Sequence, residues 1–338
     1  MEANRNCPFC DEKAVIKSNI VEKEFRKERF QIYEFFYKCE SCNEEFTVKE
    51  TDTLVLNQIY NQYREKHGIP FPEELVQLRK KYRISAQKMS LILGFGINTY
   101  SNYEKGEMPS IANAKLISSA KHIEMFYSYL SQSKEVLSEQ AFMKIDEYVK
   151  TLASSKEDDF FLGNFNWHNT PNKYTGYTVP NPEKVANLLL YFLANCNPEY
   201  NDKLKLKKMM FYTDFLNYKK TGRSISGISY RAIPYGPVPS NYDFIFAHFI
   251  EKEEIFEPVF YKVNNSKVTE SYLPLKDSDL SVFSTEELNT IKKVVDLFTN
   301  TSSWEMVDLS HKERAWIELN KTKSIISYQD YAFDLTID

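Results

Sequence analysis

The chain has 338 residues, of which 42% are hydrophobic and 27% charged, and its formal net charge is −4. This length is sufficient for two or three domains, and the composition excludes a largely disordered chain. Nine glycines argue against a glycine-rich nucleotide-binding fold. The longest apolar run, at 185–196, is too short to cross a bilayer, and the N-terminus lacks the pattern of a secretory signal. We therefore expect a cytoplasmic protein with no membrane partner.

Two CxxC pairs, CPFC and CESC, lie near the N-terminus of a chain with only one other cysteine. Each tight turn presents two thiols, and a hairpin between the pairs would bring all four together as the tetrahedral ligand set of a structural zinc site. The alternatives are local disulfides, a redox pair or an iron–sulfur cluster. The predicted zinc ligands are Cys7, Cys10, Cys39 and Cys42.

Residues 1–53 have the pattern of a small β module around this site. Aromatic and β-branched residues alternate over 29–39, and the run at 15–25 can pair with it as a hairpin. The expected fold is zinc-ribbon-like, with metal binding supplying folding free energy that so small a core lacks. The fifth cysteine, Cys196, lies in an apolar helix and is expected to be a buried core thiol.

Helical spacing replaces the β pattern over residues 54–152. Within this segment Ser85 can cap one helix, Gly94 can end it, and 97–106 follows as the next helix. Three helical segments with a glycine-bearing turn between the second and third are the layout of a helix-turn-helix domain. The residues expected in its core are Leu75, Leu78, Met89, Ile92, Leu93, Ile97 and Tyr100.

This segment resembles the Cro/repressor-type helix-turn-helix family. The resemblance implies DNA binding through the third helix, and one such module has a small footprint, so we expect a homodimer on operator DNA with 111–152 as its interface. Ala86 stands where the family often has glutamine, and Gly96 where it has a capping serine. The alternative is a helical packing unit that binds a protein instead of DNA. The matching residues are Leu78, Arg79, Ser85, Leu93, Gly94, Tyr103, Glu104, Gly106 and Pro109.

The residues expected to contact DNA lie in the segment 97–106. Amide side chains pair with adenine, so Asn98 and Asn102, one helical turn apart, are the candidates for base recognition. The neighbouring polar residues Thr99, Ser101 and Lys105 are expected to contact the phosphate backbone.

A four-cysteine module followed by this helix-turn-helix resembles the antitoxins of the MqsA type. The resemblance implies that the zinc module is structural and that the helical module represses its own operon. Asn98 stands at that family's usual base-reading position, whereas Asn102 replaces a common arginine.

Residues 153–182 are rich in Asn, Thr, Gly and Pro, which predicts a linker. The remaining segment, 183–338, has the pattern of helices with short strands, including a hairpin near 256–275 and a helix that a capping box of Ser284 and Glu287 begins. We expect an α+β domain here.

Three short motifs stand out in this C-terminal segment. They are Leu206, Lys208, Met209, Met210 and Tyr212, then Ala232, Tyr235, Gly236, Pro237 and Val238, and last Leu309, Ser310, His311, Glu313 and Trp316. With these motifs the segment resembles the Panacea domain, also called the SocA-like antitoxin domain. The resemblance implies that the domain neutralises a toxin by binding it directly. The candidate toxin contacts are Lys205, Lys208, Tyr212, Tyr235, Gly236, Pro237, Val238 and His311.

The first motif has the spacing of an amphipathic helix. It predicts that Leu206, Met209, Met210 and Phe211 face the core, whereas Lys205 and Lys208 form a basic face for nucleic acid, for an acidic partner or simply for solvent. In the second motif, Gly236 and the prolines predict a rigid turn.

His311 near Glu313 suggests a general base, but no nucleophile motif or phosphate-binding loop accompanies it, and a hydrogen-bonded structural histidine is the simpler reading. We expect no enzyme activity.

The sequence therefore predicts a mainly α protein with small β elements in four segments: 1–53, 54–152, 153–182 and 183–338. The predicted function is that of an antitoxin of a type II toxin–antitoxin system, which binds its toxin and represses its operon. The alternatives are a stand-alone transcriptional regulator that responds to a ligand or phage protein, and an adaptor that delivers a toxin to a protease.

Overall fold

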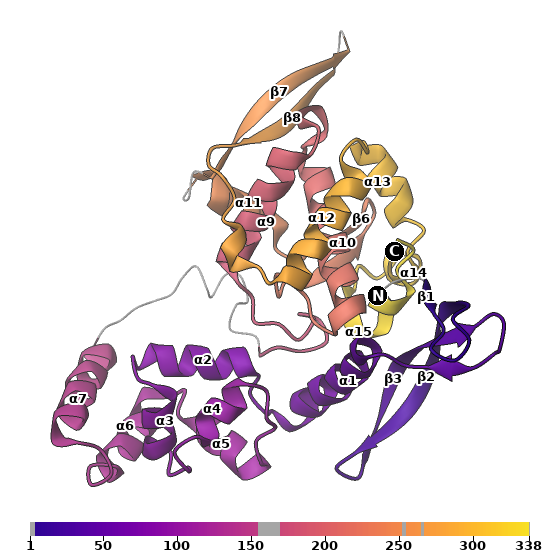
Figure 1. Ribbon diagram of the computed structural model, residues 1–338. Helices are drawn as coiled ribbons and strands as arrows, with labels where there is room; N and C mark the ends of the chain where they lie inside the picture. Colours follow the sequence, from indigo (N-terminus) through magenta and orange to yellow (C-terminus); the bar gives the residue numbers. More distant parts are fainter. Residues whose placement is uncertain (1–3, 155–169, 252–254, 265–266, 338) are drawn as a thin grey trace. The chain divides into compact units, whose positions relative to one another are not determined.

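The computed structural model describes residues 4–154, 170–251, 255–264 and 267–337 (Figure 1). About half of the chain is helical, and the sheets are small. The chain forms two compact units, one made of Met1–Ile59 with Phe165–Asp338 and the other of Tyr60–Asn164. Among the described residues, no helix has the length and apolar character that a membrane span requires.

The N-terminal segment forms an antiparallel sheet in the order β1 (Asn4–Asn6), β2 (Lys13–Phe25), β3 (Glu28–Cys39) and β4 (Glu45–Phe46). The long β2–β3 hairpin confirms the predicted pairing. Arg26 and Lys27, with φ of 49° and 67°, form its two-residue turn, because left-handed dihedrals in both positions match the twist of the strands.

Helix α1 (Lys49–His67) follows the sheet and begins inside the segment assigned to the β module. The Gln58 amide accepts a hydrogen bond from the Tyr33 N–H at 2.9 Å and donates to the Tyr33 carbonyl at 2.8 Å, as a neighbouring strand would. The Tyr33 ring stacks on Phe333 at 4.4 Å between centroids, and Phe35 packs on the same ring. These contacts join the N-terminal sheet to the end of the chain.

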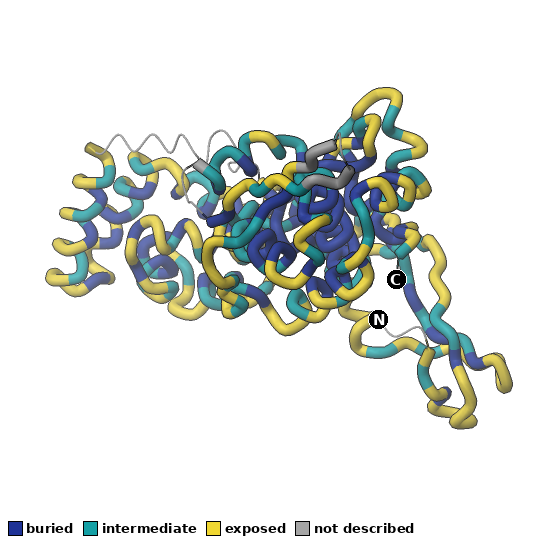
Figure 2. Tube along the Cα trace, turned by 90° about the horizontal axis from the view of Figure 1, so that it is seen from above, coloured by how far each residue is buried: buried dark blue, intermediate teal, exposed yellow. Residues whose placement is uncertain are grey.

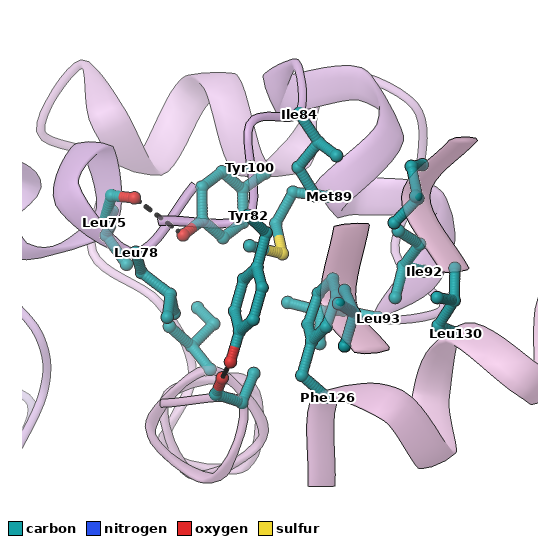
Figure 3. Close-up of a cluster of buried hydrophobic side chains, with 14 of the residues drawn as sticks. Leu75, Leu78, Tyr82, Ile84, Met89, Ile92, Leu93, Tyr100, Phe126 and Leu130 are labelled. Atoms are coloured by element: carbon teal, nitrogen blue, oxygen red, sulfur yellow. Dashed lines mark hydrogen bonds between the residues drawn. The ribbon is translucent and has the colours of Figure 1, made fainter. Parts of the chain in front are cut away.

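The second unit contains α2 (Pro72–Lys81), α3 (Ala86–Ile92), α4 (Thr99–Glu104), α5 (Ile111–Ser119), α6 (Ile123–Gln132) and α7 (Glu139–Ser154). Its core includes the stacked rings of Tyr82 and Phe126, whose centroids are 3.6 Å apart. Both rings are labelled in Figure 3. The buried hydroxyls are paired, because Tyr82 donates to the Ala120 carbonyl and Tyr100 to that of Leu75. A tightly packed core with satisfied polar groups defines this unit.

The predicted core of this unit is confirmed at Leu75, Leu78, Met89, Ile92, Leu93 and Tyr100. The prediction for Ile97 is wrong, because its side chain is 55% exposed in the turn before α4. The predicted cap is confirmed, since Ser85 accepts from the Lys88 N–H, and Gly94 has a left-handed φ of 72°.

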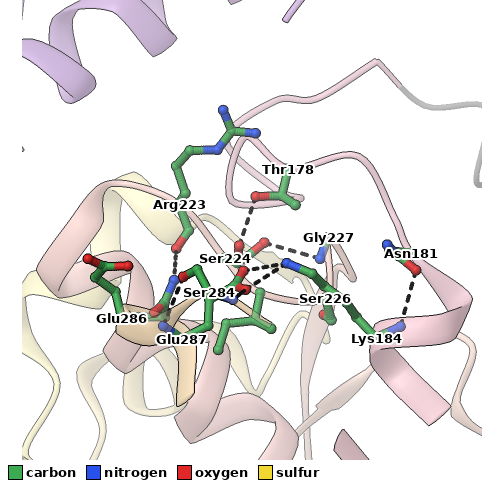
Figure 4. Close-up of polar contacts among 12 residues, drawn as sticks. Thr178, Asn181, Lys184, Arg223, Ser224, Ser226, Gly227, Ser284, Glu286 and Glu287 are labelled. Atoms are coloured by element: carbon green, nitrogen blue, oxygen red, sulfur yellow. Dashed lines mark hydrogen bonds and ion pairs between the residues drawn. The ribbon is translucent and has the colours of Figure 1, made fainter. Parts of the chain in front are cut away.

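Residues 155–169 of the predicted linker lie outside the described residues. Residues 153–154 end α7, whereas 170–182 are packed: Tyr177 is buried, and the Ser224 N–H donates to the Gly176 carbonyl. The hydroxyl of Thr178 donates to the Ser224 carbonyl (Figure 4). This stretch is therefore part of the C-terminal fold.

The C-terminal part of the first unit packs around α10 (Lys203–Thr221), whose residues from Lys205 to Tyr218 are all buried. Figure 2 shows the chain coloured by burial, with buried helical segments in dark blue. The other helices are α9 (Pro182–Asn195), α11 (Tyr242–Glu251), α12 (Thr285–Phe298), α13 (Ser303–Ser310), α14 (Arg314–Leu319) and α15 (Tyr328–Tyr331). The strands are β5 (Tyr230–Ile233), β6 (Gly236–Pro239), β7 (Phe256–Asn264), β8 (Lys267–Pro274) and β9 (Ile325–Ile326).

Two sequence predictions in this region are confirmed. Strands β7 and β8 form the expected hairpin. Ser284 and Glu287 form the capping box of α12, and the Glu287 carboxylate also accepts two bonds from the Lys184 ammonium, at 2.6 and 2.7 Å (Figure 4). This ion pair ties the start of α9 to the start of α12.

Candidate functional site

The four predicted metal ligands lie together: the Sγ atoms of Cys7, Cys10, Cys39 and Cys42 are all within 4.8 Å of one another. The shortest separations are 3.4, 3.5 and 3.7 Å. A tetrahedral zinc site with Zn–S bonds of about 2.3 Å has sulfur–sulfur edges of about 3.8 Å, whereas a disulfide measures about 2 Å. All five cysteines are free thiols. The cluster can therefore hold a metal ion.

The two CxxC turns have the same backbone design. The N–H of Cys7 donates to the Glu12 carbonyl, and that of Cys39 donates to the Glu44 carbonyl. The residue after each second cysteine is left-handed, with φ of 62° at Asp11 and 60° at Asn43, and Asp and Asn tolerate this conformation better than most residues. The sequence therefore encodes two matching knuckles.

Backbone donors prepare one ligand for its thiolate form. The N–H groups of Cys42 and Ser41 lie 3.5 and 3.4 Å from the Cys39 sulfur, and they lower the pKa of that thiol to about 6 because they favour the charged form. Cys196, in contrast, is buried beside the Met209 sulfur in the C-terminal helices, which confirms it as a core thiol.

The predicted basic face on the first-motif helix is wrong. Lys205 and Lys208 are fully buried, because other elements surround α10 on all sides. The Lys205 ammonium donates to the Thr299 carbonyl at 3.1 Å, and that of Lys208 donates to the Tyr235 carbonyl. Between them, the Lys207 ammonium lies 3.3 Å from the centroid of the Tyr242 ring. The buried lysine side chains of this helix thus make contacts inside the fold.

Three side chains hold the turn between β5 and β6, which we call the clamped turn (residues 233–236). The Trp316 indole N–H donates to the Ile233 carbonyl at 2.8 Å, the His311 Nε2 bonds the Pro234 carbonyl at 3.0 Å, and Lys208 bonds the Tyr235 carbonyl. Three consecutive carbonyls are therefore each paired with a side chain from α10 or from the α13–α14 region. These donors belong to the first and third sequence motifs, and the turn itself is the second.

The histidine of the clamp has a structural setting. Its ring stacks on Trp316 with centroids 3.6 Å apart and planes at 11°. Because a carbonyl only accepts, Nε2 carries the proton. Burial lowers the pKa of His311 and so favours the neutral ring, whose Nε2–H donates to the Pro234 carbonyl.

Gly236 closes the clamped turn at a position that admits no side chain. Its φ is 100°, and an added Cβ would lie 2.2 Å from the Ser310 Oγ and 2.3 Å from the Lys208 Nζ. Both the dihedral and the close approach of α10 and α13 therefore require glycine here.

The clamped turn presents one aromatic ring to solvent. Tyr235 is 56% exposed, and its ring meets that of Trp304, 57% exposed, edge to face at 6.1 Å between centroids. Trp304 lies in the first turn of α13, where Ser302 and Glu305 form a capping box. Trp304 was not predicted as a site residue; its only sequence signal is a tryptophan at an outward helical position.

Of the eight predicted toxin contacts, only Tyr235 is exposed and His311 half-buried. The other six are buried and support the turn and its surroundings: Lys205, Lys208, Tyr212, Gly236, Pro237 and Val238. Of these eight residues, only Tyr235 and His311 therefore present side-chain surface to solvent.

A buried carboxylate that sequence reasoning missed fixes the approach to β5. Asp214 accepts bonds from the N–H groups of Ile225 and Ser226, each at 2.8 Å, from the Ser226 hydroxyl, and from the Tyr230 hydroxyl at 2.7 Å. Burial raises the pKa of Asp214, and the four donors offset the cost of placing it in the core.

In the second unit, the predicted DNA-contact residues lie on and beside α4. Asn98, Asn102 and Lys105 are exposed, and Thr99 and Ser101 are half-buried. Asn98 precedes the helix and makes no capping bond with its side chain. Arg79 holds Glu104 through two hydrogen bonds, of 2.6 and 3.3 Å, which attaches α4 to α2.

Residues 206–317 match the family model of the SocA-like antitoxin, Panacea domain. The chain therefore contains a Panacea domain. The match begins in α10 and ends in α14, so it includes the clamped turn and its three donors. A search of the curated proteins found no match. In the Panacea domain of this chain, the motif residues assemble one rigid turn.

Gly236→Ala should destabilise the Panacea domain by about 2–5 kcal/mol, because strain at positive φ adds to overpacking. Gly106→Ala is the control: φ there is 107°, but nothing lies within 4 Å of the added Cβ, so only about 1–2 kcal/mol should be lost. Urea unfolding followed by circular dichroism measures both. Equal losses would contradict the crowding at Gly236.

Burial lowers the pKa of Lys208 to about 7. Between about pH 7 and pH 10 the unfolded chain binds a proton at Lys208 that the folded chain does not, so stability should rise with pH in this window, by up to about 1.4 kcal/mol per pH unit. Lys208→Met should remove this contribution, seen as a smaller slope in urea unfolding at pH 7, 8, 9 and 10. Identical slopes would show that Lys208 is charged in the fold.

Proposed function

We propose that this protein is the antitoxin of a type II toxin–antitoxin system, which neutralises its toxin by binding it through the Panacea domain. The observation that carries the proposal is the family match over 206–317 together with the convergence of all three motifs on the clamped turn. The motif side chains bond backbone atoms, which suits a rigid binding surface and no chemical step. We therefore propose binding, with no enzyme activity, in the cytoplasm.

The second unit supports a role in operator binding. Arg79 and Glu104, both residues of the helix-turn-helix resemblance, form an ion pair that joins α2 to α4, and the polar residues Asn98 and Asn102 are exposed on one side of α4. We propose that this unit is a helix-turn-helix that inserts α4 into the major groove of operator DNA and represses the antitoxin's own operon as a homodimer.

The proposed metal is a structural zinc ion held by the four cysteine thiolates. The sulfur separations fit a closed tetrahedral site, since the group found among the described residues consists of four cysteines. Zinc bound there would hold both knuckles and so stabilise the zinc-ribbon-like sheet.

The zinc proposal is tested by the metal content of the purified chain. The full chain should contain about one zinc per chain by mass spectrometry of metals, Cys39→Ser should lose most of it, and Cys196→Ser should keep it because that thiol is a core residue. Equal zinc in the Cys39 variant, or iron in the unmodified chain, would contradict the proposal.

The functional test uses the protein encoded by the adjacent reading frame. Expressed alone it should stop growth, and the full chain should restore growth while the amount of the toxic protein stays constant. Loss of the toxic protein on rescue would favour delivery to a protease, and a harmless neighbour would favour a stand-alone regulator.

Asn98→Ala should weaken binding to the promoter DNA of this gene by about 1–3 kcal/mol at a fixed salt concentration and leave growth rescue unchanged, because base contacts and toxin contacts lie in different units. Fluorescence anisotropy with labelled promoter DNA measures the affinity. Asn195→Ala, an exposed asparagine of α9, is the matched control. Equal affinity of the two variants would show that α4 does not read the bases.

A further inference from the structure

We infer that the exposed pair Tyr235 and Trp304, with the carboxylates of Glu305 and Asp308 beside it, is the surface on which the Panacea domain docks a basic protein. This inference rests on the proposed toxin-binding function and names the contact surface and the chemistry of the partner.

The first argument is exposure. Many large aromatic residues of this unit are packed in its interior, as Tyr212, Tyr230 and Tyr328 are, and Phe9, Tyr174 and Phe260 are exposed elsewhere on it. Tyr235 and Trp304 leave more than half of their surface in water while touching each other. Tryptophan and tyrosine are the residues most enriched among energetic anchors of protein interfaces.

The second argument is order. Tyr235 lies on a turn whose three carbonyls are bonded, and Trp304 lies in a helix start that a capping box fixes. Gly236 and Ser310 pack directly against each other beneath the pair. Two anchors held in advance lose little conformational entropy on binding.

The third argument is charge. The exposed face of α13 carries Trp304, Glu305 and Asp308, whereas Lys205 and Lys208 of the neighbouring α10 are buried and bond backbone carbonyls inside the fold. Lys312 lies beyond the end of α13. An acidic rim around an aromatic pair complements arginine or lysine side chains, which pair with carboxylates and lie over aromatic faces. The same rim repels the phosphates of nucleic acid.

The experiment measures the affinity of the full chain for the purified protein of the adjacent reading frame, by calorimetry at 50 and 300 mM salt. Trp304→Ala and Tyr235→Ala should each weaken binding by about 30-fold or more. Asp308→Asn should weaken it several-fold at low salt and reduce the salt dependence. Because Trp304 is exposed, its variant should keep the urea midpoint of the unmodified chain, measured by circular dichroism.

Phe260→Ala is the matched control, an aromatic residue of β7 that is 69% exposed, and its affinity should stay within about threefold of the unmodified chain. Unchanged binding in both the Trp304 and the Tyr235 variants would overturn this inference alone. Failure of the unmodified chain to bind would overturn the proposed function as well. If Trp304→Ala abolishes only the self-association of the chain, the surface of Tyr235 and Trp304 binds a second copy of this chain. That result would also overturn the inference.

Discussion

The C-terminal domain depends on one constraint, the pairing of three consecutive carbonyls in the clamped turn. A tight turn exposes carbonyl groups that no strand can satisfy, and here an indole, an imidazole and an ammonium group bond them in order. Each donor comes from a different position in the chain, so the turn has its shape only when α10, α13 and α14 are all packed. The contacts of the motif residues therefore explain their presence, because these residues hold the backbone of the turn that carries Tyr235.

The cysteine cluster and this turn belong to the same compact unit. Cys39 ends β3, and Tyr33 and Phe35 of that strand pack on Phe333. Three residues later, Thr336 bonds the buried carboxylate of Glu313 through its hydroxyl and its N–H, and Glu313 precedes α14. A metal at the cysteine cluster would thus stabilise a sheet that is part of the same folding unit as the toxin-binding domain we propose.

Local patterns in the sequence predicted much of this fold. The cysteine spacing identified the cluster, strand alternation identified both hairpins, and Ser85 and Ser284 marked helix starts because capping depends only on neighbouring residues. The sequence did not predict the burial of side chains whose partners lie far along the chain. Helical spacing assigned Lys205 and Lys208 to solvent, but their acceptors, the Thr299 and Tyr235 carbonyls, lie far along the chain. No local pattern reveals such partners.

We propose that the donors of the clamped turn affect toxin binding only through the Tyr235 ring that the turn holds, and a double-mutant cycle tests this proposal. His311→Phe keeps a ring on Trp316 but removes the bond to the Pro234 carbonyl. The affinity for the protein of the adjacent reading frame is measured in two backgrounds. His311→Phe should weaken binding about tenfold when Tyr235 is present, and it should have little effect when Tyr235 is already replaced by alanine. An equal loss in both backgrounds would contradict the account.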